Sequence, residues 1–350
     1  MAFRINGETF WNINIVIKYM KQKINILCAT DNNYAPYCGI MLTSLFESNR
    51  DSRFDVYVFV DGDLSKKNVA KFNGLGKKYE NKVVLMTIDN ELFKDCPVNK
   101  IILGESHNYI TLPTYYRLLA SEFLPQTIDK IIYFDCDIAI DGDIKPLWET
   151  NVDGRAVACV ADCFPFNKQT DERLGYAKEY GYFNAGVLVL NLGFWREHQL
   201  SKKMFDYINE KKRELRFMDQ DVLNAVLFDK KRMVPERYNY QICFLFPDFW
   251  ERYSLEFRQV LMEESDKAVV IHYCAPTKVW NYRYDGGPFC AVWNKYRKMS
   301  LWRHCVVKYP RSKYIKFLAK KFLFPSLFKS QREGIWIMTP GNEKKFDMEK

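Results

Sequence analysis

An apolar run that ends in two carboxylates constrains this chain more than any other segment. Ile131 to Phe134 shows no alternation of apolar and polar residues, which predicts a buried parallel strand, and Asp135 and Asp137 follow directly. In an open α/β sheet, ligands gather at the carboxyl ends of strands, and a spacing of two residues puts both carboxylates on one side of extended backbone. Paired carboxylates are hard ligands for Mg²⁺ or Mn²⁺. The alternative is a solvated acidic turn.

Similar apolar runs alternate with helical segments along the chain. Strands are expected at residues 24–28, 55–60, 83–88, 156–161 and 187–192. Helices are expected after Ser65, at 114–120 behind Pro113, and at 195–211. Such alternation predicts an α/β fold with a mostly parallel sheet wrapped by helices.

Composition limits the compartment and the class of protein. The chain has 350 residues, of which 48% are hydrophobic, enough for one large α/β domain and an appendage. Its ten cysteines show no disulfide framework, and no Cys-x-x-Cys pair predicts a zinc site. Four of them lie in or beside apolar runs as free thiols: Cys28, Cys136, Cys159 and Cys274. With no secretory signal and no apolar run of about 18 residues, a cytoplasmic protein is expected.

The positive charge is concentrated near the carboxyl end. The net charge is +9, yet residues 294–332 hold twelve Lys or Arg and no acidic residue. As a helix, this segment would separate Lys313, Lys316 and Lys320 from an apolar side. That pattern is typical of a protein that binds the anionic inner face of the cell membrane. A solvated basic helix that caps the domain is the alternative, and nucleic-acid binding is less favoured.

Four more segments complete a pattern in a fixed order. They are residues 24–34, 182–188, 218–221 and 272–280. Together with Asp135 and Asp137, they resemble glycosyltransferase family 8, and bacterial lipopolysaccharide galactosyl- and glucosyltransferases in particular. The resemblance implies a single GT-A-type nucleotide-binding domain at 23–287. The remaining parts are an N-terminal extension at 1–22, a basic amphipathic helical tail at 288–332, and a C-terminal end at 333–350 for which disorder is expected.

The resemblance implies a metal site and a donor site. His272 matches a third metal ligand beside Asp135 and Asp137, and an imidazole ligand favours Mn²⁺ over Mg²⁺. Lys278 is expected to meet phosphate oxygens. The residues expected to hold uridine are Ala29, Asp31, Asn33 and Tyr34. Taken alone, the segment Asp31 to Asn33 also fits a helix-capping turn, and His272 fits a structural histidine.

The resemblance also implies a catalytic group around the donor hexose. Its members are Arg117, Asn184, Asp219 and Gln220. Asp162 matches a position that faces the acceptor. Taken alone, Arg117 fits an exposed helix position, and Asp219 with Asp221 fits a helix N-terminus. Because a neutral amide is a poor nucleophile, we favour attack by the acceptor hydroxyl on the face that UDP leaves, with a covalent two-step route as the competing mechanism.

These expectations combine into one function. The chain is predicted to be a metal-dependent, retaining hexosyltransferase that moves galactose or glucose from UDP-galactose or UDP-glucose to a cell-surface glycan or glycolipid. Retention of configuration follows from the resemblance. One alternative is a UDP-sugar hydrolase or phosphotransferase, since paired aspartates indicate only that the protein acts on phosphate groups. The other is a noncatalytic sugar-nucleotide-binding protein.

Overall fold

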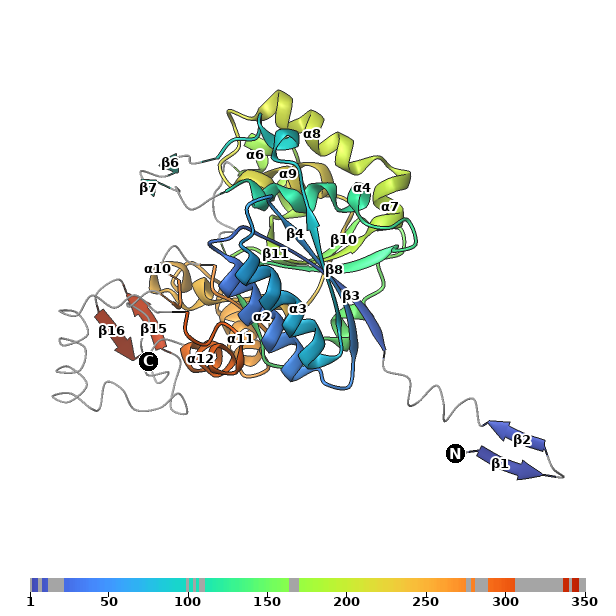
Figure 1. The fold of residues 1–350 in the computed structure, drawn as a ribbon. Helices are drawn as coiled ribbons and strands as arrows, with labels where there is room; N and C mark the ends of the chain where they lie inside the picture. The colour runs from blue at the N-terminus through green and yellow to red at the C-terminus, as the bar shows by residue number, and fades with distance from the viewer. Residues whose placement is uncertain are drawn as a thin grey trace.

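A seven-stranded sheet forms the centre of the molecule, in the order β12-β10-β11-β8-β3-β4-β5 (Figure 1). The computed structural model describes residues 22–98, 111–163, 170–274, 278–280 and 289–305, with short strands at 2–5, 8–11, 101–102, 105–106, 336–339 and 342–345. The strands of the central sheet are β3 (Lys23–Thr30), β4 (Arg53–Val60), β5 (Lys82–Thr87), β8 (Lys130–Phe134), β10 (Val157–Ala161), β11 (Phe183–Asn191) and β12 (Lys231–Met233). Only β11 runs antiparallel to its neighbours, so the predicted mostly parallel α/β sheet is confirmed.

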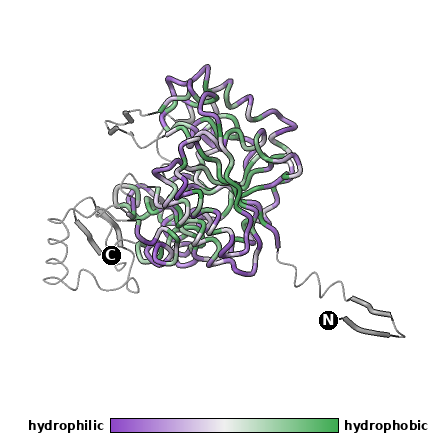
Figure 2. The backbone as a smooth tube through the Cα atoms, viewed as in Figure 1, coloured by the Kyte–Doolittle hydropathy of each residue, from purple (hydrophilic) through white to green (hydrophobic). Residues whose placement is uncertain are grey.

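Helices cover both faces of this sheet, and the sheet separates the hydrophobic core into two clusters. Alternate residues of β3 point to opposite faces, so that Ile26 joins one apolar cluster and Leu27 the other. The first cluster includes buried residues of α2 (Ala35–Ser48), α3 (Lys66–Tyr79), α11 (Leu255–Ser265) and α12 (Cys290–Met299). The second includes those of α4 (Ala120–Phe123), α7 (Leu192–Glu197), α8 (Leu200–Lys211) and α9 (Met218–Leu227). Figure 2 shows the hydrophobic backbone concentrated in the strands between them.

A small second sheet lies at the carboxyl end of β8. It has the order β13-β14-β9 and consists of β13 (Tyr240–Gln241), β14 (Val270–His272) and β9 (Ile138–Ile140). Because β9 begins directly after Asp137 and its Ile138 pairs with His272, this sheet carries the histidine to the paired aspartates. The register between two distant segments therefore assembles the predicted metal ligands.

Two of the predicted helices differ in detail from the helices in the structure. The helix expected at 195–211 is divided into α7 and α8, because Gln199 adopts the left-handed conformation at φ 53°. The helix expected at 114–120 is a 3₁₀ helix, η2 (Leu112–Leu119), followed by α4. In η2, Arg117 is 4% exposed rather than solvated, and its guanidinium donates hydrogen bonds to Asp135 and to the Ala185 carbonyl.

The first part of the predicted basic tail packs on the domain. Residues 289–305 contain α12, whose Trp293 and Tyr296 are each 1% exposed. The Trp302 ring lies directly on Gly39 of α2, where an added Cβ would come within 2.1 Å of it. Trp302 also donates a hydrogen bond from Nε1 to Asn68 Oδ1 at 3.0 Å. Residues 306–332, which hold the predicted membrane-binding helix, lie outside the described residues.

The predicted end segments each contain a short antiparallel strand pair. β1 (Ala2–Ile5) pairs with β2 (Glu8–Trp11), and β15 (Trp336–Thr339) pairs with β16 (Asn342–Lys345). Among the helices that the structure describes, none has the length and apolar character needed to cross a membrane.

Candidate active site

The three predicted metal ligands converge where the two sheets meet. His272 Nε2 lies 3.3 Å from Asp137 Oδ1 and 3.9 Å from Asp135 Oδ2. One ligand atom from each of the three side chains lies within 4.8 Å of the other two. Two backbone hydrogen bonds fix the chain here: Asp135 donates to Gly186, and Tyr273 donates to Asp137. Two carboxylates and one imidazole fit a divalent cation such as Mn²⁺.

The side-chain amides of Asn239 and Asn184 orient His272. Asn239 donates from Nδ2 to Asn184 Oδ1 at 2.8 Å, so its own Oδ1 faces His272 Nδ1 at 2.9 Å as the acceptor. Nδ1 therefore carries a proton, and Nε2 is the nitrogen that faces the carboxylates and would bind a metal once it has lost its own proton. Asn239 is fully buried. No pattern along the chain distinguishes Asn239, and only the fold reveals its role.

The predicted metal binding at His272 should depend on pH. Burial disfavours the imidazolium, but the neighbouring groups, Asp137 first and then Cys274 and Asp135, together outweigh burial and raise the pKa of His272 from 6.5 to about 9. In the metal-free protein this charge contributes stability that is complete below pH 6.5 and lost as the pH rises through about 9. Metal binding requires neutral Nε2, so it should release about one proton near pH 7. Calorimetry of Mn²⁺ binding in two buffers of different ionisation enthalpy measures that proton. Binding without proton release would contradict the assignment of His272 as a ligand.

Arg117 holds the carboxylates on the other side of the site. Its guanidinium donates to Asp135 Oδ1 at 2.8 Å and to the Ala185 carbonyl at 2.6 Å, and it lies 3.0 Å from Asp219 Oδ2. The Tyr133 hydroxyl donates to the same Asp135 oxygen at 2.8 Å. Burial raises the pKa of Asp219 to about 6, although Arg117 opposes this shift. Arg117 thus orients Asp135 in this structure, and Tyr133, two residues before Asp135, was not predicted.

Lys278 pairs with the second aspartate. Its Nζ lies 2.6 Å from Asp137 Oδ2 and donates to the Tyr273 carbonyl at 3.1 Å. Burial alone would raise the pKa of Asp137, but Lys278 and His272 hold it well below its usual range. Asp137 is therefore a carboxylate at neutral pH, as a metal ligand must be.

A pocket opens beside these charged groups. Its walls are Ala29, Thr30, Asp31, Tyr34, Thr111, Pro113, Thr114, Arg117, Tyr133, Asp135, Cys136, Asp137 and Lys278. Three of the four residues predicted to hold uridine line it, whereas Asn33 is exposed and is not among its walls. Asp31 accepts from the Tyr34 amide at 2.8 Å and from the Thr111 hydroxyl at 3.1 Å, so it also shapes the turn that precedes α2.

Three of the predicted sugar and acceptor residues form one connected polar cluster, whereas Asp219 pairs with Arg117 and Thr114. Asp162 Oδ2 accepts from Asn184 Nδ2 at 2.9 Å and from Gln220 Nε2 at 3.0 Å. Gln220 Oε1 accepts from the Ala185 amide at 2.9 Å, so both ends of its side-chain amide are held. Asn184 joins this cluster to the metal ligands, since its Oδ1 accepts from Asn239.

The comparisons with known proteins agree with this arrangement. The family model for glycosyl transferase family 8 matches residues 25–283. The chain belongs to glycosyltransferase family 8. This confirms the predicted family and the predicted enzyme class, a hexosyltransferase.

Individual relatives are similar over most of their length. The lipopolysaccharide 1,3-galactosyltransferase of Salmonella typhimurium is 28% identical over 307 residues, which cover 86% of each chain. A lipopolysaccharide 1,2-glucosyltransferase of Escherichia coli is 28% identical over 264 residues, covering 75% of this chain and 74% of that protein. The structure of galactosyltransferase LgtC in complex with donor and acceptor sugar analogs is 24% identical, with a TM-score of 0.66, and covers 84% of this chain and 100% of that one. This likeness shows that the fold is of the same GT-A type.

Proposed function

We propose that this family 8 enzyme is a metal-dependent, retaining transferase that moves galactose or glucose from a UDP-sugar to a lipopolysaccharide-type glycan. The observation that carries the proposal is the convergence of His272 with Asp135 and Asp137, two residues that line the pocket. The cluster of Asp162, Asn184 and Gln220 is joined to these ligands through Asn239. The names of the relatives support a lipopolysaccharide acceptor and a hexose donor.

Each group has a role in this proposal. Bound to the three ligands, Mn²⁺ or Mg²⁺ would neutralise the diphosphate as UDP leaves. Tyr34 would stack on uracil, and Asp31, with Ala29 and Asn33, would hold the nucleoside. Lys278 lies next to the metal ligands and would contact phosphate oxygens. The hexose would lie over the Asn184, Asp219 and Gln220 side, with the acceptor at Asp162.

Gln220 serves this reaction as a polar contact rather than as a nucleophile. Its amide is neutral and hydrogen-bonded at both ends, so it lacks the activation that covalent catalysis requires. We favour a front-face route in which the acceptor hydroxyl attacks from the side that UDP leaves. A trapped glycosyl adduct on the protein would establish the covalent route instead.

Gln220→Ala should lower kcat by more than it raises the donor KM. We expect a fall in kcat of about 10²- to 10³-fold, because a polar contact made mainly in the transition state is lost. Steady-state kinetics with UDP-galactose and UDP-glucose at saturating Mn²⁺ measure the two effects. An unchanged kcat would remove Gln220 from the mechanism.

One donor screen tests the function itself. Turnover of UDP-galactose and UDP-glucose is measured in the presence of Mn²⁺, with and without a short glycan acceptor. The products are identified by mass spectrometry. Transfer that requires the acceptor and stops with a chelator supports the proposal. Free hexose released at the same rate without the acceptor would make the chain a hydrolase. No turnover of any donor would make it a noncatalytic sugar-nucleotide-binding protein.

We also propose that residues 306–332 bind the cytoplasmic face of the membrane and bring the site to a lipid-linked acceptor. Each Lys or Arg near an anionic surface contributes about 1 kcal/mol. Because Trp293, Tyr296 and Trp302 pack in the core, a truncation must leave residues 289–305 in place.

Truncation after Cys305 should release the protein from anionic vesicles and leave transfer to a short soluble acceptor nearly unchanged. Binding of the full chain should weaken as salt rises, since salt screens the attraction. Sedimentation with vesicles measures binding, and a chain that ends at Arg332 is the matched control. Equal binding of both truncated chains at low salt would refute the membrane role.

A further inference from the structure

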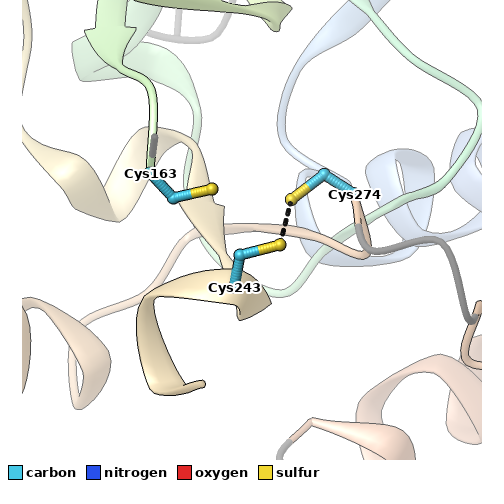
Figure 3. Close-up of side chains that lie close together, drawn as sticks. All are labelled: Cys163, Cys243 and Cys274. Atoms are coloured by element: carbon cyan, nitrogen blue, oxygen red, sulfur yellow. Dashed lines mark hydrogen bonds between the residues drawn. The ribbon is translucent and has the colours of Figure 1, made fainter. Parts of the chain in front are cut away.

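Three cysteines from distant segments point toward one another beside the active site (Figure 3). They are Cys163, Cys243 and Cys274, whose sulfur atoms all lie within 4.8 Å of one another. The Sγ atoms of Cys243 and Cys274 are 3.3 Å apart. Cys163 and Cys243 are buried, whereas Cys274 is partly exposed.

The fold places these cysteines together by strand register. β13 and β14 run parallel, and Gln241 pairs with His272. Cys243 and Cys274 each follow their paired residue by two positions, so the two thiols emerge side by side at the same sheet end. Cys163 comes directly after Asp162, beyond the end of β10. The absence of a Cys-x-x-Cys pair therefore does not exclude a thiolate site in this chain.

The backbone around Cys163 is held independently of its sulfur. Its amide donates to Gln241 Oε1 at 2.9 Å, and its carbonyl accepts from the Tyr253 hydroxyl at 2.7 Å. Gln241 also donates to the Ala161 carbonyl at 2.7 Å. These contacts position the thiol before any ligand arrives, as preorganised metal sites require.

We propose that Cys163, Cys243 and Cys274 bind one thiophilic divalent cation, of the chemical class of Zn²⁺, as three thiolates with the fourth position open. Zinc–sulfur bonds of about 2.3 Å in tetrahedral geometry separate two sulfurs by about 3.8 Å. In this cluster, Cys243 Sγ and Cys274 Sγ are 3.3 Å apart, and all three sulfurs lie within 4.8 Å of one another, so small side-chain shifts would bring them to that spacing. The ligand set is soft, whereas Asp135, Asp137 and His272 form a harder set, so the two sites select different ions.

The cation would tie together three segments that each border the active site. Cys163 follows the acceptor-facing Asp162, and Cys274 lies two residues beyond His272. The bound cation would therefore limit the movement of Asp162 and His272 without contacting the substrate itself. The role is structural and positioning, and it does not depend on the donor sugar.

Cobalt titration tests this site, because Co²⁺ bound to thiolates gives a sulfur-to-metal charge-transfer band that oxygen and nitrogen ligands do not produce. The reduced, chelator-treated full chain carries Asp135→Asn to weaken the hard site. We expect the band to saturate at one Co²⁺ per chain and to disappear when Zn²⁺ is added. Cys243→Ser and, separately, Cys163→Ala should each abolish the band, with the fold checked by circular dichroism.

The control is Cys159→Ser, a buried cysteine on β10 that lies outside the cluster, and it should retain the full band. No band in the reduced chain would overturn the proposal. A band of unchanged intensity in both cluster variants would also overturn it. A Cys243–Cys274 disulfide in the isolated protein, with no metal taken up after reduction, would assign these thiols to redox chemistry and would equally refute the cation site.

Discussion

Asp135→Ala should reduce sugar transfer about 10³-fold or more while leaving the fold stable, because the loss of a proposed metal ligand would remove several kcal/mol of charge stabilisation at the proposed diphosphate leaving group. Arg117, which pairs with Asp135, keeps Asp219 and two backbone carbonyls as partners, so its charge stays compensated. The measurements are kcat/KM at saturating Mn²⁺ and the thermal midpoint.

Asp137→Ala should inactivate the enzyme as strongly but also lower its melting temperature. Lys278 is buried, and its one ion pair with a described residue is with Asp137, so the substitution leaves a buried charge without its partner. Asp206→Ala, on the exposed face of α8, is the matched control and should change neither quantity. Full transfer by Asp135→Ala, or by the unmodified enzyme in chelator, would refute the metal role.

Gly186→Ala should weaken Mn²⁺ binding about 10- to 100-fold although it changes no ligand, since it displaces a ligand that neighbouring groups hold in place. A Cβ at this position would lie 2.2 Å from His272 Cε1 and 2.7 Å from Nδ1. The ring cannot turn away without breaking its hydrogen bond to Asn239. Titration of activity against Mn²⁺ measures the effect.

Gly62→Ala is the matched control for this substitution. No heavy atom lies within 4 Å of a Cβ built at Gly62, so Mn²⁺ affinity should not change. Equal Mn²⁺ affinities for the two variants would mean that His272 does not bind the metal in the position it occupies here.

Much of the fold follows from local pattern. The apolar run before Asp135 predicted β8, and Ser65 predicted the start of α3, whose Asn68 amide it caps at 3.3 Å. Strand and helix periodicities depend on near neighbours in the chain, so they can be read without knowing what packs against them. The same reading missed the break at Gln199, where nothing in the local pattern signals a left-handed residue. It also missed the antiparallel direction of β11, because strand direction depends on pairing with distant strands.

The residues of the candidate active site also divide into those that local sequence patterns identify and those that they do not. Asp135 and Asp137 were recognisable along the chain because a strand end and a spacing of two residues are local features. His272, Arg117 and Gln220 were reached only through the resemblance of several motifs in order.

Asn239, Tyr133 and the cysteine cluster had no signal in the sequence that identified them. Asn239, Cys243 and Cys274 are placed by the register between β13, β14 and β9, which join segments far apart in the chain. Tyr133 lies on β8, and its role becomes visible only in its hydrogen bond to Asp135. Local patterns along the chain identify the strand ends and the chemistry that they carry. Which strand ends lie next to each other is visible only in the folded molecule, because that choice rests on packing between distant segments.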